Sequence, residues 1–225
     1  MLNEKDMMKK AVGEKAVTFV EDGMKIGLGS GSTVYWMIRR LGERIKEDGI
    51  QVEGIPSSEQ TAMWAKEFGV PLTDFAAVKE LDITIDGADE VDENLQLIKG
   101  GGAALFREKI IAQAASKLII IVDDSKMVKK LGKYPLPVEV LPFGWERTAN
   151  EISKLGCDPA LRMKDGKPLV TDNGNYILDC PFGVIESPVE LDGKLQAIAG
   201  VIETGLFVDL TSQVILSDGK DIKVI

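Results

Sequence analysis

Hydrophobic positions in the first 122 residues alternate between a helical period and short continuous runs. Val34, Ile38, Leu41 and Ile45 recur every three or four residues, as on one face of a helix. Leu118 to Val122 is a continuous apolar run, typical of a buried strand. The pattern predicts helices over 4–21, from 34 onward, from 57 to about 68, and over 103–116, and strands over 25–28, 51–55, 81–85, 95–98 and 118–122. Strands that alternate with helices indicate a parallel sheet covered on both faces.

The pattern changes near Gly132. A proline-marked strand over 134–140, a helix over 145–155, two strands around the Asp165–Gly166 turn and a helix over 188–198 predict a small α+β insert. Strands over 206–225 are expected to return to the first sheet. We therefore predict an α/β protein with a main domain formed by 1–131 and 205–225, and a smaller domain, 132–204, that acts as a flap beside the main domain's crevice.

Composition narrows the classes of function. The net charge of −9 argues against extended nucleic-acid binding, which needs a basic face. The charged segment Met1–Asp6 stands where a signal peptide would be apolar, and the longest strongly apolar run is too short for a membrane span. Cys157 and Cys180 form no CxxC pair, which argues against a disulfide framework or zinc site and favours a reducing cytoplasm.

The chain contains no histidine. A Ser-His-Asp triad and histidine-based zinc sites are therefore excluded. Acid–base chemistry must use Asp, Glu, Lys, Tyr or Cys side chains. We predict an enzyme without a metal or other cofactor.

A glycine-rich segment, Gly27–Thr33, lies between a predicted strand and a predicted helix. Backbone N–H groups, hydroxyls and a helix N-terminus make such a turn a candidate phosphate site. A P-loop is excluded because no Gly-Lys-Ser/Thr is present. A dinucleotide-binding loop matches at Gly27 and Gly29, with Glu53 near the ribose position, but Ser32 replaces its third glycine. The segment could also be a tight turn that binds no ligand, and this alternative stays open.

A second polar segment, Asp86-Gly-Ala-Asp89, follows a predicted strand at the end where ligands bind in open α/β sheets. Two neighbouring carboxylates should differ in proton affinity, which suits proton exchange with hydroxyls. The alternative is an Asp-rich turn that caps the next element.

Two further segments are predicted at the same sheet edge. Lys99-Gly-Gly-Gly102 leads into a helix in which Glu108 shares a side with Ala104, Ile111 and Ala115. Desolvation there would raise the pKa of Glu108 toward that of a general base; the alternative is an exposed residue in a charge run. Lys126, after the strand 118–122, could donate to a substrate or belong to a capping turn.

The ordered set of motifs resembles ribose-5-phosphate isomerase of the A type. A lone DGAD or GSGST would be weak, but the segments follow the family's order, cover nearly the whole chain and are together highly specific. The matching segments are Gly29–Thr33, Asp86–Glu90, Lys99–Leu105, Arg107–Lys109, Asp124–Lys126, Gly132–Val140 and Thr171–Asn175.

The resemblance implies metal-free interconversion of D-ribose 5-phosphate and D-ribulose 5-phosphate in the non-oxidative pentose phosphate pathway. It implies a Rossmann-like catalytic domain, a smaller ferredoxin-like domain used as a lid or for oligomerisation, and a homodimer or dimer of dimers. Glu108 matches the family's proton acceptor, and we assign Asp86, Asp89 and Lys99 to the chemistry with it. The substrate-binding residues expected are Ser30, Gly31, Ser32, Thr33, Asp86, Gly87, Ala88, Asp89, Lys99, Gly100, Gly101, Gly102 and Lys126, with Lys9 or Lys10 assisting.

Three other functions compete with this one. A sugar-phosphate sensor would keep the phosphate loop without needing the aspartate–lysine–glutamate set, and the chain shows no DNA-binding module. An aminosugar-phosphate deaminase or a CoA transferase would share the fold but not the complete set.

Overall fold

The computed structural model describes residues 3–225 and divides the chain into two compact units. Unit 1 contains the residues up to Ala88, Arg107–Lys126 and Leu210–Ile225; unit 2 contains Asp89–Phe106 and Met127–Asp209. Residues 89–106, 127–131 and 205–209, which the sequence assigned to the main domain, thus pack with unit 2. The two units are distinguished by how compactly their residues pack, which says nothing of what each unit does. The lid and oligomerisation roles of the smaller domain therefore stay predictions.

Within residues 3–225, unit 1 holds a six-stranded sheet in the order β15-β14-β6-β3-β1-β2. The five strands from β14 to β2 run parallel to one another, and β15 is an antiparallel edge strand. Because β1 lies between β2 and β3, the direction in which strands are added reverses at β1, which makes this a topological switch point. The strands are β1 (Lys25–Leu28), β2 (Glu53–Pro56), β3 (Ile83–Asp86), β6 (Leu118–Asp123), β14 (Gln213–Ser217) and β15 (Ile222–Val224).

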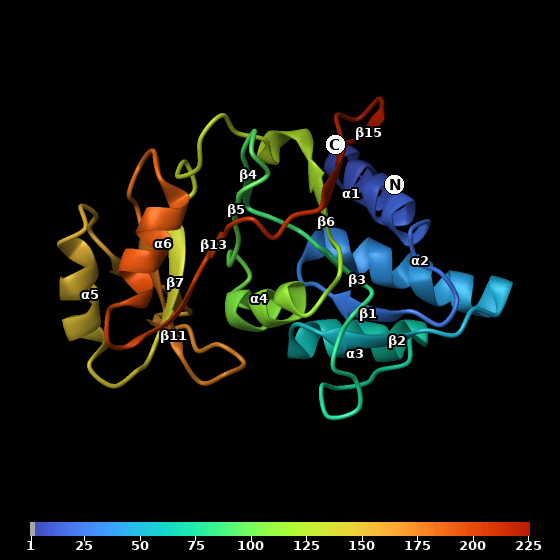
Figure 1. Cartoon of the computed structure of the whole chain (residues 1–225), viewed down its shortest axis with the longest axis horizontal. Coiled ribbons are helices and arrows are strands. Elements are labelled where there is room, and N and C mark those ends of the chain that lie inside the picture. The colour runs from blue at the N-terminus through green and yellow to red at the C-terminus, as the bar shows by residue number, and fades with distance from the viewer. Residues whose placement is uncertain (1–2) are drawn as a thin grey trace. The chain divides into compact units, whose positions relative to one another are not determined.

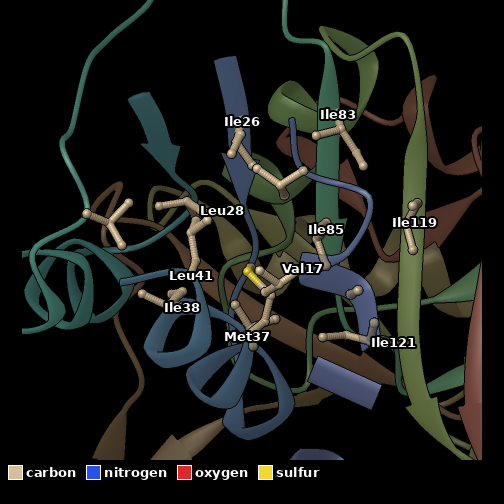
Figure 2. Close-up of a cluster of buried hydrophobic side chains, with 14 of the residues drawn as sticks. Val17, Ile26, Leu28, Met37, Ile38, Leu41, Ile83, Ile85, Ile119 and Ile121 are labelled. Atoms are coloured by element: carbon tan, nitrogen blue, oxygen red, sulfur yellow. The ribbon is translucent and has the colours of Figure 1, made fainter. Parts of the chain in front are cut away.

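Alternate residues of the parallel strands build the core of unit 1 on one face of the sheet. Ile26 pairs with Ile83, and Ile85 with Ile119, so that these side chains stack across β1, β3 and β6. They pack with side chains from α1 (Glu4–Val17) and α2 (Ser32–Asp48) (Figure 2). Helix α3 (Glu59–Phe68) adds Ala65 to the same cluster.

The opposite face of the sheet carries Thr84 and the candidate site residue Asp86. Thr84, which alternates with Ile83 and Ile85, donates from Oγ1 to the carbonyl of Ile111 at 3.0 Å. Ile111 belongs to α4 (Leu105–Gln113), a helix whose residues from Arg107 onward lie in unit 1. One sheet face therefore supports the core, and the other supports α4.

Unit 2, which lies wholly within the described chain, is built around an antiparallel sheet in the order β12-β7-β11-β8. With α5 (Trp145–Ser153) and α6 (Pro188–Gln196), its chain order is β7-α5-β8-β11-α6-β12, the split βαβ arrangement of ferredoxin-like domains (Figure 1). The remaining strands form the sheet β13-β5-β4 and the hairpin β9-β10. The bounds are β4 (Glu90–Val91), β5 (Leu97–Ile98), β7 (Leu136–Val140), β8 (Ala160–Leu161), β9 (Met163–Lys164), β10 (Lys167–Pro168), β11 (Tyr176–Cys180), β12 (Val201–Thr204) and β13 (Leu206–Phe207); the 3₁₀ turn η1 (Asp124–Lys126) belongs to unit 1.

The predicted α/β class, the parallel main sheet and the return of the tail to that sheet are confirmed. The pattern missed β11, which pairs with both β7 and β8 in the small sheet. The predicted helix start at Ser57 was one residue early, because Ser58 is the N-cap and accepts from the Thr61 N–H. In the described part of the chain, no helix combines the length and apolar character needed to cross a membrane.

Candidate active site

The glycine-rich loop meets Asp86 at the switch point of the main sheet. The Asp86 carboxylate is fully buried, and its Oδ1 accepts from the N–H of Ser30 at 3.0 Å and of Gly87 at 2.7 Å. A Cβ added to Gly29 would lie 2.1 Å from Asp86 Oδ1, so only glycine permits this approach. Crevices at such switch points, outside the carboxyl ends of the strands, are where open α/β sheets bind ligands.

The N-terminus of α2 provides the anion-binding features predicted for this loop. Gly31 is the N-cap with φ +101°, a conformation that favours glycine, and no side chain caps the helix there. Ser32 and Thr33 begin the first turn, with Ser32 exposed and Thr33 half-buried. Unsatisfied N–H groups and the helix dipole of 17 residues both favour a phosphate at this end.

Ser30 has a role that its place in the motif did not reveal. Its hydroxyl lies 2.7 Å from Ser57 Oγ, 3.0 Å from Ser58 Oγ and 3.3 Å from Thr61 Oγ1. Thr61 in turn donates to the Gly29 carbonyl at 2.8 Å. This hydroxyl cluster joins the glycine loop to the start of α3. The sequence did not assign Ser57, Ser58 or Thr61 to the site, because their partners lie about thirty residues away.

Glu108 is buried, with 5% of its surface exposed, so the alternative of a surface glutamate is wrong. The direction of α4 places it near the end of β3: Leu81 N–H donates to the Ala114 carbonyl, and Thr84 bonds to Ile111, three residues earlier on the helix. Glu108 lies one helical turn before Ile111, about 5 Å along the helix. Asp86 lies two residues after Thr84, about 7 Å along the strand. Both carboxylates therefore lie on the same sheet face, toward the same strand end.

Lys126 ends η1, directly after β6. Asp86 pairs with Ile120, so β6 continues three residues beyond the end of β3, about 10 Å, before this turn begins. Lys126 is half-buried there. Lys9 and Lys10 lie on α1, where Lys10 forms an ion pair with Glu14 at 3.6 Å.

Unit 2 carries the remaining predicted residues. Asp89 is half-buried and accepts the Gly101 N–H at 2.7 Å through Oδ2. Lys99 is buried, with 3% of its surface exposed, and its Nζ lies 5.4 Å from the centre of the Phe207 ring. Gly101 and Gly102 are exposed beside them.

The structure thus brings part of the predicted set together, in one group in each unit. In unit 1, Asp86 contacts the glycine loop, with Glu108 on the same sheet face; in unit 2, Asp89 contacts the loop that follows Lys99. The Ala88–Asp89 peptide bond joins the groups along the chain. Over residues 3–225, His, Cys, Asp and Glu side chains form no group of three that could hold a metal ion.

Comparison with known proteins identifies the family. The model of the family "Ribose 5-phosphate isomerase A (phosphoriboisomerase A)" matches residues 53–221. The chain is 69% identical over 223 residues to ribose-5-phosphate isomerase A 1 of Oceanobacillus iheyensis, covering 99% of this chain and 100% of that protein.

Solved structures agree with the sequence match. A D-ribose-5-phosphate isomerase in complex with phospho-erythronic acid is 41% identical with a TM-score of 0.96, covering 100% of this chain and 99% of the other. Ribose 5-phosphate isomerase A of Methanocaldococcus jannaschii is 40% identical with a TM-score of 0.94, covering 98% and 99%. The chain therefore belongs to the ribose-5-phosphate isomerase A family, and it interconverts ribose 5-phosphate and ribulose 5-phosphate.

Proposed function

We propose that Glu108 is the general base of this isomerisation and that Asp86, Asp89 and Lys99 are the other catalytic residues. One observation carries the proposal: Glu108 is buried and lies on the same sheet face as Asp86, toward the same strand end. At that strand end Asp86 contacts the glycine loop. A carboxylate shielded from water is suited to removing a carbon-bound proton.

In the isomerisation one proton moves from C2 to C1, and the carbonyl group moves from C1 to C2. After the ring opens, Glu108 takes the proton from C2 of the aldose and returns it to C1 of the enediol. The C2 hydroxyl loses its proton and becomes the ketone, while the C1 carbonyl oxygen gains a proton and becomes a hydroxyl. We assign ring opening and these hydroxyl protons to Asp86 and Asp89.

Negative charge develops on the oxygens while C2 loses its proton. Lys99 supplies a positive charge, and the Gly100–Gly102 amides supply N–H donors that need no reorganisation during the reaction. The burial of Lys99 supports this role, because a charge in a water-excluded position acts strongly on its neighbours.

Substrate specificity would come from the 5-phosphate. We propose that the N-terminus of α2 binds it, through the segment from Gly31 to Thr33, with Lys126 and either Lys9 or Lys10 assisting. The Ser30 hydroxyl would act through the hydroxyl cluster as well as toward the ligand, since a hydroxyl both donates and accepts.

Glu108→Gln tests the assignment of the base. The amide cannot accept the proton, so we expect kcat for ribulose 5-phosphate formation to fall roughly 10²–10⁴-fold with little change in KM. A matched control is Glu139→Gln, which alters another buried glutamate, in unit 2 and outside the proposed site. It should keep kcat within about threefold at a temperature where it is folded. Near-normal kcat in Glu108→Gln would refute the assignment.

The proposed groups suffice without a metal ion. We expect ribulose 5-phosphate formation in a coupled assay to continue at an unchanged rate after dialysis against EDTA. Complete loss that is restored by a divalent cation would overturn this expectation.

We also propose a homodimer or dimer of dimers in the cytoplasm. Large exposed apolar side chains on unit 2, among them Phe143 at 95% exposure, support self-association, and the free thiols of Cys157 and Cys180 suit a reducing compartment. Light scattering after size-exclusion chromatography should give two or four times the mass of 24.5 kDa. A monomer at micromolar concentration would contradict the proposal. Cell fractionation tests the compartment.

A further inference from the structure

Arg162 stands between β8 and β9 in unit 2, and β11 fixes its side chain. Its Nε donates to Asp179 Oδ2 at 2.9 Å, and its Nη2 donates to Asp179 Oδ1, forming a two-pronged ion pair. The side chain is 13% exposed. Burial opposes the charge of Arg162, but the hydrogen bonds and charge of Asp179 outweigh it, so that the pKa of the guanidinium is raised.

The remaining arm of this guanidinium reaches the loop that follows Lys99. Nη1 donates to the Gly100 carbonyl at 2.7 Å and to the Gly101 carbonyl at 3.2 Å, across more than sixty residues of sequence. Tyr134 lies in the same cluster: burial and then the charge of Asp89 raise its pKa, while Arg162 lowers it. One rigid side chain thus holds two successive peptide groups of the loop.

The geometry of the peptide bond fixes the direction of the loop's N–H groups once Arg162 holds the carbonyls. Because a trans peptide is planar, its N–H points opposite to its carbonyl. With both carbonyls on Arg162, the N–H groups of Gly101 and Gly102 point away from it, and that of Gly101 meets Asp89 Oδ2 at 2.7 Å. The same guanidinium therefore sets the direction of the Gly102 N–H and the bond from the Gly101 N–H to Asp89.

The loop would not keep this conformation unaided. Gly100 has φ +107°, and Ala103 has φ +59°, a region that few residues other than glycine adopt. Ala103 N–H closes the turn on the Gly100 carbonyl at 3.0 Å, the same oxygen that Arg162 holds. Strained backbone persists only where neighbouring contacts fix it.

We propose that Arg162 is a positioning residue for the isomerisation: it holds the Gly100 and Gly101 carbonyls so that the Gly102 N–H stabilises the enediolate oxygen and the Gly101 N–H orients Asp89. This inference rests on the proposed function, which places those amides and Asp89 in the reaction. Arg162 itself need not contact the sugar phosphate.

The test compares Arg162→Met and Arg162→Lys with wild type, using ribose 5-phosphate as substrate. Because phosphate binding is assigned to unit 1, we expect the Met variant to lose about 10–100-fold in kcat with KM changed less than about threefold. Lysine can reach the carbonyls but cannot form the two-pronged pair, so it should recover part of kcat. Millimolar guanidinium should likewise raise kcat of Arg162→Ala.

Arg44→Met is the matched control. Arg44 has a related bonding pattern in unit 1: Nε donates to one carboxylate oxygen of Asp48 at 2.9 Å, and Nη1 donates to the carbonyls of Val17 and Val20 at 2.8 and 2.6 Å. Its loss should lower Tm while kcat per folded molecule stays within about twofold, since it anchors no proposed catalytic loop.

The outcomes separate this inference from the assignment of the base. If Glu108→Gln loses activity and folded Arg162→Met keeps kcat within about twofold, the positioning role is refuted alone. If Glu108→Gln keeps its activity, the proposed site itself is wrong. Should Arg162→Met fail to fold, kcat of Arg162→Lys decides: a wild-type value overturns the inference, and a partial loss without a KM change supports it.

Discussion

Gly29 shows how a missing side chain shapes the site at the scale of single residues. The end of β1 lies so close to β3 that an added Cβ would stand 2.2 Å from Asp86 Cγ and 2.6 Å from its Cα. The Asp86 carboxylate occupies the space that any other residue at position 29 would fill. Its two backbone hydrogen bonds depend on that space.

We expect Gly29→Ala to displace Asp86, lowering kcat by at least about tenfold and stability by about 1–3 kcal/mol, as overpacking does. Gly193→Ala is the control, because Gly193 lies exposed within α6 with no atom near the added Cβ. That change should stabilise by about 0.5–1 kcal/mol and leave kcat unaltered. Urea unfolding and steady-state kinetics measure both effects, and equal behaviour of the two variants would contradict the steric argument.

Residues that the sequence identified differ in kind from those it missed. Asp86, Asp89 and Lys99 stand in short local motifs next to strand ends, so pattern and resemblance could find them. Arg162 and Thr61 act on carbonyls 62 and 32 residues away, and no local spacing reports such partners. The burial of Glu108 was one of two open alternatives until the face of α4 was known.

At the scale of elements, Glu139 anchors the turn that precedes β11. It is fully buried in β7, and its Oε1 accepts from Thr171 Oγ1 at 3.0 Å, Asn173 Nδ2 at 3.1 Å and Asn175 Nδ2 at 2.9 Å. One carboxylate oxygen therefore fixes the turn over 171–175 and, with it, the register of β11 on β7.

Glu139→Ala should destabilise the protein by about 3–5 kcal/mol, because three donors would lose a buried charged acceptor. Glu186→Ala removes an exposed glutamate of the same unit, paired with Lys130, and should change stability by less than about 1 kcal/mol. Chemical denaturation followed by far-UV circular dichroism compares the two. A loss at position 139 as small as that at position 186 would show that the turn is held by other contacts.

This network also explains why β11 escaped prediction. Ile177 and Leu178 are both buried although they point to opposite faces, so the strand lacks the alternation of a half-exposed sheet. The motif before it reads as a turn, and the Glu139 bonds that lock this turn to β7 come from more than thirty residues away. The parallel strands of unit 1 were predicted because helices separate them regularly along the chain.

At the scale of the whole molecule, substrate should stabilise the fold by mass action. At about one hundred times its Kd, ribose 5-phosphate should add roughly 2.7 kcal/mol, which for this length corresponds to a rise in Tm of about 5–10 °C. Ribose without phosphate should raise Tm far less at the same concentration, because the α2 N-terminus then has no anion to bind. Differential scanning fluorimetry measures both, and equal shifts would argue against the phosphate site.

The division of the chain also sets the order in which its parts can be completed during synthesis. Unit 2 ends at Asp209, but unit 1 needs the last sixteen residues, because β14 pairs with β6 along Gln213–Ser217. Synthesis of unit 1 begins before that of unit 2 and is completed after it. Until residues 213–217 emerge from the ribosome, the apolar strand Leu118–Asp123 has one edge without its partner, an exposed edge of the kind that favours association between nascent chains. The main sheet can therefore close only after the whole of unit 2 has been synthesised.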